Sequence, residues 1–294
     1  GDLSDIDQEI KAAILASLLE LHNSGKLVYQ YDGFNKFKHL KHPDILEQLE
    51  SYISDSKRNF QSRYVAIDIA ESCNLQDASP SLVEVALSSE NPYLIRVRAA
   101  RFVATTGREV DKLRLRDLYR VPQNDPEDDL RGYGLSATYP KHISTEEVLS
   151  HLTQPQVNYF GGSYQRFIAH DLGERLPDSD LEIAFEWVKK QPVKHESHYP
   201  FDALADSILL RAWEHLDDPE ILSIFAEIVV SRQSQYAQVI DNHGSVSFRE
   251  MLQGDDDKRR ALIEKCVSII QHSDGDPYWL SGNSHYSSLT PLKQ

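Results

Sequence analysis

Cysteine and methionine are scarce in this sequence of 294 residues, which has two cysteines and one methionine. The cysteines, Cys73 and Cys266, lie far apart, each in an apolar stretch with a helical pattern. Two thiols exclude a disulfide-rich scaffold and a zinc site of four cysteines, so we expect both to be free and buried. This composition is typical of a cytoplasmic protein.

Basic residues are also in the minority, with 31 Lys and Arg against 46 Asp and Glu and a formal net charge of −15. This surplus of negative charge disfavours binding to the phosphate backbone of nucleic acids. No apolar run reaches the roughly 18 residues of a transmembrane helix, so we expect no membrane partner. The chain opens with Gly1 instead of methionine, which we interpret as a sign of a fragment or a trimmed product.

The short motifs of common enzyme classes are missing as well. The sequence has no Gly-x-Ser-x-Gly elbow, no His-Glu-x-x-His helix and no glycine-rich loop that ends in Gly-Lys-Ser or Gly-Lys-Thr. Histidine pairs occur as His39 with His42 and as His195 with His198, but two ligands do not make a metal site. We therefore predict a non-catalytic protein without cofactor or metal.

What the sequence has is a succession of helical patterns with almost no strand signal. Apolar residues recur at three- and four-residue spacing, and several segments begin with Asp, Asn or Ser before proline, a helix-capping pattern. The predicted helices cover residues 4–22, 43–53, 59–73, 80–87, 92–105, 110–119, 126–138, 145–152, 162–172, 179–190, 199–216, 219–232 and 256–272. We expect an all-α protein.

The first predicted helix, residues 4–22, is amphipathic. One of its faces carries Ile6, Ile10, Ala13, Ile14, Ser17, Leu18 and Leu21. We predict that this helix caps the N-terminal end of the fold. Residues 273–294 are rich in Ser, Gly, Asp and Asn and are predicted to form an irregular tail.

Four arginines mark an internal repeat. Arg63, Arg96, Arg131 and Arg166 follow one another at intervals of 33, 35 and 35 residues, and three positions after them stand Ala66, Ala99, Gly134 and Ala169. A period of this length in helical segments indicates stacked helix pairs. We predict that each small residue lets the helix of the next repeat approach closely. We also predict that the arginines pair with carboxylates across repeat boundaries.

The segments that carry this repeat resemble HEAT repeats. In residues 91–103 and 125–138, an apolar residue and arginine are followed by small and then apolar positions. The resemblance covers about five repeats, over residues 43–216. It implies a right-handed α-α superhelix, an armadillo-like solenoid of about six or seven helix pairs that forms a single domain over residues 1–272.

A finer resemblance involves the runs 128–132 (DDLRG), 139–149, 152–155 and 161–167 (GGSYQRF). They are similar to the helical-repeat region beside the nucleotide-binding core of bacterial NACHT-type (STAND) NTPases. The resemblance implies a sensor or protein-interaction module of a larger signalling NTPase. Its partner would be another protein or the nucleotide-binding domain of the same longer chain. A stand-alone scaffold protein is the alternative within this class.

A local excess of basic residues leaves a second class of function open. Between residues 96 and 120 the basic side chains are Arg96, Arg98, Arg101, Arg108, Lys112, Arg114, Arg116 and Arg120. A basic groove here would suit a HEAT-like protein that binds nucleic acid or repairs DNA. The net charge of −15 disfavours this alternative.

Aromatic residues in and beside the predicted connections are candidates for a protein-partner site, because large amphipathic side chains often anchor interfaces. These residues are Tyr159, Phe160, Tyr164 and Tyr199. Trp187 and Trp213 fall within predicted helices instead, and we expect them to be buried.

Overall fold

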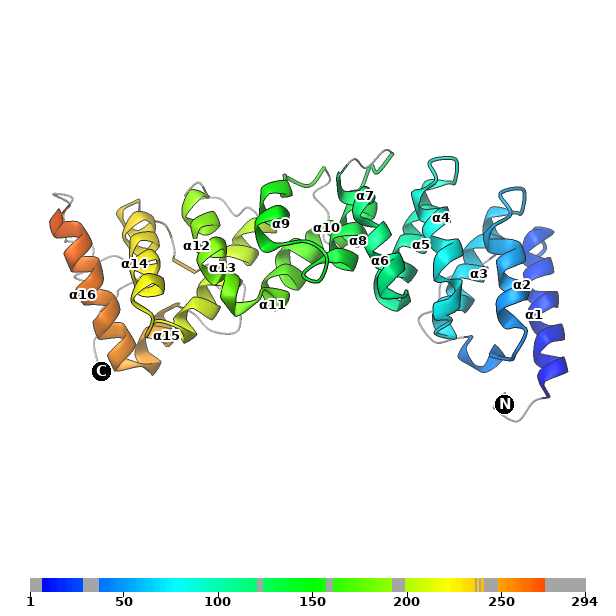
Figure 1. The fold of residues 1–294 in the computed structure, drawn as a ribbon, viewed down its shortest axis with the longest axis horizontal. Helices are drawn as coiled ribbons and strands as arrows, with labels where there is room; N and C mark the ends of the chain where they lie inside the picture. The colour runs from blue at the N-terminus through cyan, green and yellow to red at the C-terminus, as the bar shows by residue number, and fades with distance from the viewer. Residues whose placement is uncertain are drawn as a thin grey trace. The chain divides into compact units, whose positions relative to one another are not determined.

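The computed structural model describes residues 7–28, 37–120, 124–156, 161–191, 199–235, 237, 239–240 and 248–272. Every regular element in these residues is a helix and none is a strand, which confirms the all-α prediction (Figure 1). The chain divides into two compact units, Gly1–His142 with Thr153–Tyr164 and Ile143–Leu152 with Gln165–Gln294. A single domain over residues 1–272 stays a prediction, and the predicted tail, 273–294, lies outside the described residues.

The first unit contains the helices predicted between residues 4 and 138, with small shifts at their ends, except that the helix predicted over 110–119 is divided at Leu115 into two. They are α1 (Gln8–Asn23), α2 (Ile45–Ile53), α3 (Phe60–Ser72), α4 (Ser79–Leu87), α5 (Tyr93–Thr106), α6 (Glu109–Arg114), α7 (Arg116–Arg120) and α8 (Asp129–Thr138), with short 3-10 turns η1 (Lys38–Leu40) and η2 (Gln76–Ala78). Cap residues set two of the starts: Asp7 accepts a hydrogen bond from the backbone N–H of Glu9, and Asn59 from that of Gln61.

Consecutive helices of the first unit pack in pairs, α2 on α3, α4 on α5 and α7 on α8. The second helices of these pairs also pack on one another, α3 on α5 and α5 on α8, in the order in which Figure 1 shows them. One buried apolar core links these helices and includes Val65, Ala66, Ile95 and Ala99. Each pair thus buries part of its apolar surface against its neighbour in the sequence.

The repeated arginines share a backbone position, the third or fourth residue of α3, α5, α8 and α10 (Ser163–Arg166). Their side chains do not share one environment. Arg63 and Arg96 are buried and donate hydrogen bonds to the carbonyl oxygens of Ile53 and Ala86, each ten residues earlier, at distances of 3.1 and 3.0 Å. The side chain of Arg166 is 74 % exposed and lies 3.8 Å from Asp171.

Two other residues of α5 make carboxylate pairs across the boundary between successive helix pairs. Arg98 pairs with Asp68 of α3, and Arg101 lies 3.1 Å from Glu71 of the same helix. Arg63 and Arg96 use their guanidinium groups on carbonyl oxygens at the ends of α2 and α4, which lack partners within those helices. Carboxylate pairing across the boundary between successive pairs is thus seen for Arg98 and Arg101, and for Arg63 and Arg96 it stays a prediction.

The small residues also act differently from the prediction at the one position where the contact is resolved. A Cβ atom on Gly134 would lie 2.9 Å from the carbonyl oxygen of Leu115 and 3.1 Å from the Cβ of Leu118. The nearest atoms to Gly134 therefore belong to α7 and the residue before it, within the same pair. A Cβ atom on Gly132 would lie 2.2 Å from the backbone nitrogen of Tyr164, so Gly132 makes the contact with the following segment.

The second unit continues the helical succession. Its elements are α9 (Thr145–His151), the end of α10, the π-helical η3 (Phe167–Asp171), α11 (Leu172–Arg175), η4 (Asp178–Asp180), α12 (Leu181–Lys190), α13 (Phe201–Glu214), α14 (Pro219–Ser234), α15 (Phe248–Gly254) and α16 (Asp256–His272). The sequence pattern did not predict α15, whose buried residues Phe248, Met251 and Leu252 form too short an apolar stripe to stand out.

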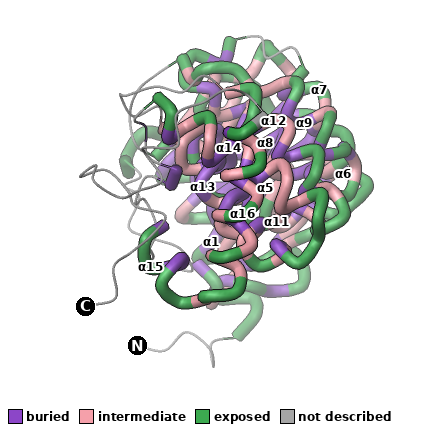
Figure 2. Tube along the Cα trace, turned by 90° about the vertical axis from the view of Figure 1, so that its left-hand side faces the viewer, coloured by how far each residue is buried: buried purple, intermediate pink, exposed green. Residues whose placement is uncertain are grey.

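Buried and exposed stretches alternate along the helical trace (Figure 2), because most helices bury one side only. Trp187 and Trp213 are only partly buried, contrary to the prediction. The ring of Trp187 lies 6.2 Å from that of Phe201, and the Lys258 ammonium lies 6.0 Å from the ring of Trp213. Trp213 therefore keeps one face toward a charged group, which favours partial exposure.

Candidate interaction surface

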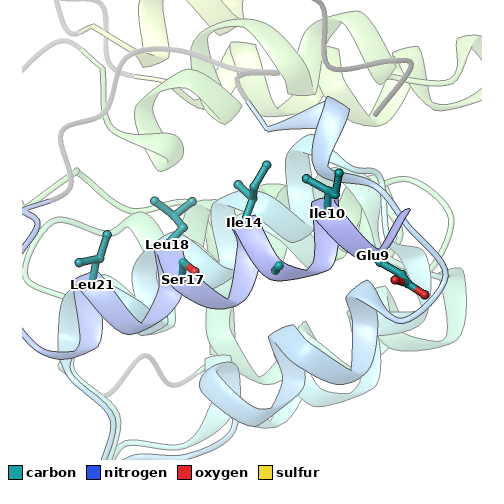
Figure 3. A pocket seen from close by; sticks show the side chains of 7 residues that line it. Glu9, Ile10, Ile14, Ser17, Leu18 and Leu21 are labelled. Carbon is teal, nitrogen blue, oxygen red and sulfur yellow. The ribbon is translucent and has the colours of Figure 1, made fainter. Parts of the chain in front are cut away.

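An exposed row of apolar side chains follows one side of α1. Ile10, Ile14 and Leu21 have exposed fractions of 52, 38 and 42 %. An open hollow of about 590 Å³ along this side is lined by Glu9, Ile10, Ala13, Ile14, Ser17, Leu18 and Leu21, which together we call the α1 face (Figure 3). An amphipathic helix usually turns such a row toward the core. Here the row lies at the surface.

The α1 face is exposed because α1 has a second apolar side, and that side packs against the fold. Leu15, Leu19 and His22 are buried, and α1 packs on α3 and η1. The Nδ1 atom of His22 lies 2.9 Å from the carbonyl oxygen of Leu27, within hydrogen-bond distance. Burial of Leu15 and Leu19 therefore fixes the rotation of the helix. Leu18, at the edge of the predicted row, packs against the core, while the rest of the row stays outside.

Polar contacts hold the C-terminal end of α1 in place. The side-chain oxygen of Asn23 accepts hydrogen bonds from the backbone N–H of Asn59, at 3.1 Å, and from the hydroxyl group of Ser62, at 3.3 Å. The Tyr52 hydroxyl donates a weaker hydrogen bond, 3.4 Å long, to Glu20. The apolar row is therefore carried on an anchored helix.

The shape of the α1 face combines a ridge with a shallow groove. Ile10, Ile14 and Leu18 follow one another at four-residue spacing, and Figure 3 shows their side chains pointing to the same side of the helix. Ala13 and Ser17 form the neighbouring row and have short side chains. A ridge beside a row of small residues is the surface into which the ridge of another helix packs.

The aromatic residues predicted to bind a partner do not form one surface in the described residues. Tyr159 and Phe160 lie outside them. Tyr164 is buried: its hydroxyl lies 2.9 Å from both the backbone nitrogen and the carbonyl oxygen of Thr153, and the guanidinium of Arg131 lies 4.4 Å from the centre of its ring. Tyr199 is partly buried. The prediction of a partner site at Tyr164 was therefore wrong, because its ring and hydroxyl are engaged within the first unit.

Internal contacts occupy most of the basic side chains between residues 96 and 120. The contacts of Arg96, Arg98 and Arg101 are described above. Three more basic side chains form ion pairs: Arg108 with Asp111 at 2.7 Å, Lys112 with Glu109 at 3.1 Å and Arg114 with Glu84 at 2.5 Å. Arg116 donates a hydrogen bond to the Tyr119 hydroxyl at 3.2 Å. In each ion pair the carboxylate neutralises a positive charge that would otherwise attract the phosphate groups of a nucleic acid. The segment thus presents far less free positive charge than its composition suggests.

No group of three or more His, Cys, Asp or Glu side chains is placed to hold a metal ion in the described part of the chain. His42 is buried, with its Nδ1 atom 2.7 Å from the carbonyl oxygen of Leu40, while His195 and His198 lie outside the described residues. Of the helices that the structure describes, none has both the length and the apolar character needed to cross a membrane.

The sequence placed the described apolar residues of the α1 face on one side of a helix and predicted that this helix caps the N-terminal end of the fold, which stays a prediction; Ile6 of the predicted row lies outside the described residues. The signal in the sequence that corresponds to the exposed row is that the helix has apolar residues on two of its sides, more than one contact with a neighbouring helix buries. Comparisons with protein-family models, curated proteins and solved structures gave no match.

Proposed function

We propose that the protein is a non-catalytic protein-interaction or sensor module whose recognition surface is the α1 face. The observation that carries the proposal is the exposed row Ile10, Ile14 and Leu21 on an anchored helix. Exposed apolar rows on soluble proteins mark interaction sites, because water solvates them poorly.

The proposal includes the architecture that the arginine repeat implies, a HEAT-like right-handed solenoid of about six or seven helix pairs. Its support is the packing of α3 on α5 and of α5 on α8, together with the shared roles of Arg63 and Arg96. By its resemblance to the repeat region of NACHT-type NTPases, the module would belong to a larger signalling protein. The chain itself is then expected to show no ATP turnover.

Site-specific photo-crosslinking tests the interaction function. We expect a benzoylphenylalanine placed at Ile14 to form a discrete covalent adduct with another protein in cells that express the chain. The same group at Ile183 of α12 serves as the control, because Ile183 is an exposed isoleucine on a helix of the second unit, with an exposed fraction of 42 %. Absence of an adduct at position 14, or the same adducts from both positions, would contradict the proposal.

A further inference from the structure

The partner of the α1 face must satisfy its own backbone hydrogen bonds. Among the described residues that line the hollow, only Glu9 and Ser17 have polar side chains, and the others offer no hydrogen-bond partner. An extended segment laid on this surface would bury backbone N–H and C=O groups without partners, at a cost of about 1–3 kcal/mol each. An α-helix forms these bonds internally and avoids the cost.

The length and surface shape of the α1 face also suit a helix as the binding partner. From Ile10 to Leu21 the face extends about 16 Å along α1, or three helical turns. The Ile10–Ile14–Leu18 ridge and the short side chains of Ala13 and Ser17 form a surface that a second helix can pack against with its own ridge. An amphipathic helix with apolar residues at i, i+3, i+4 and i+7 presents the complementary side.

The charges around the α1 face favour a partner with a particular sign of charge. Three acidic residues lie on or beside the face, Glu9, Asp7 and Glu20, against two basic residues, Lys11 within α1 and Lys26 just beyond its end. The whole chain carries a formal charge of −15. Basic residues beside the apolar side of the partner would therefore be attracted to the face, and acidic residues would be repelled.

A second copy of the chain fits this surface poorly. It would bring the same negative charge into the contact. The described residues that line the hollow all belong to α1, so they offer one helix face and not the roughly 20–30 residues on each side of a standard stable interface. A single docked helix needs no larger surface.

From these observations we infer that the α1 face binds a single amphipathic α-helix with basic residues flanking its apolar side. This inference rests on the proposed interaction function and names the chemistry of the partner.

A designed peptide tests the inference directly. The probe is a fluorescein-labelled, hydrocarbon-stapled helix of roughly 18 residues, enough to cover the face, with leucines on one side and lysines beside them. A peptide of the same composition with permuted positions is the first control, and a glutamate-flanked version is the second. Fluorescence anisotropy measures the affinity of each for the full chain.

We expect the lysine-flanked helix to bind the wild-type protein, and to bind the Ile14→Asp and Ile10→Asp variants at least tenfold more weakly, because each places a charge under the docked helix. The Ile183→Asp variant, on a helix of the second unit, should bind like the wild type. Ile10 and Ile14 are partly exposed, so both variants should keep the wild-type circular dichroism spectrum.

Equal binding of the permuted peptide, of the glutamate-flanked peptide or of both face variants would overturn the inference. A dimer in sedimentation velocity that Ile14→Asp dissolves would identify a second copy as the occupant and would also overturn it. Photo-crosslinking at Ile14 separates the two proposals. A protein adduct without binding of the helical peptide would refute the helix and leave the interaction function standing, whereas loss of both would refute both.

Discussion

Arg63 and Arg96 perform the same task in successive helix pairs. Each lies in the first turn of the second helix and donates to a carbonyl oxygen at the end of the first helix, where no intrahelical N–H is available. Arg63 also donates to the side-chain oxygen of Asn91, at 2.7 Å, so one guanidinium joins its own pair to the connection between α4 and α5 of the next pair. Burial lowers the pKa of both arginines, but their usual value is so high that both remain charged.

The two thiols are expected to be unreactive in the folded protein. Burial raises the pKa of Cys73 to about 11 and that of Cys266 to about 12. In the unfolded chain both would titrate near their ordinary value of about 8.5. Above that pH the unfolded chain releases protons that the folded chain retains, so the free energy of unfolding should fall as the pH rises toward 11.

Ellman's reagent measures this difference. At pH 8 we expect almost no reaction with the native protein and rapid reaction of two thiols per chain in guanidinium chloride, because only the thiolate attacks the reagent. Rapid labelling of the native protein at pH 8 would show that at least one thiol is accessible and ionised.

At the scale of single elements, the packing of the second helices decides whether the repeat register is correct. Ala99 is fully buried on α5, which packs on α3, α4 and α8. Replacement of Ala99 by leucine should overpack this region and lower the free energy of unfolding by about 1–3 kcal/mol. The matched control is Ala16→Leu on the exposed side of α1, which should change it by less than about 0.5 kcal/mol.

Urea unfolding measures the change in the free energy of unfolding for both variants. Hydrogen exchange shows which helices lose stability in the Ala99→Leu variant. Since each repeat is stabilised by its neighbours, the Ala99→Leu variant should lose protection in α3 and α8 as well as in α5. An Ala99→Leu protein with unchanged stability and protection would mean that the site has room for a larger side chain, and would refute the tight packing inferred for this position.

At the scale of the whole molecule, electrostatics argues against nucleic acid as a partner. The net charge is −15, and the basic residues between 96 and 120 are largely held in contacts such as Arg98 with Asp68 and Arg114 with Glu84. We therefore expect no shift of short duplex DNA or RNA in a gel at physiological salt. A shift that weakens with added salt and disappears in an Arg114→Ala variant would restore the basic-groove alternative.

The sequence by itself determined the all-helical class, most helix positions and the backbone register of the arginines. These properties depend on local signals: three- and four-residue periodicity, caps such as Asn59, and a period carried by similar segments. The side chain of Tyr164 could not be placed in the same way, because Arg131 and Thr153, which engage it, lie 33 and 11 residues earlier in the chain.

Only the tertiary structure decided which apolar side of α1 is buried. Periodicity shows that Ile10, Ile14 and Leu18 share one side of the helix, but it does not show which side meets α3. Leu15 and Leu19 pack against the fold, whereas Ile10 and Ile14 of the other row stay exposed. The choice depends on the surface that the rest of the chain offers to α1, which no local pattern within the helix records.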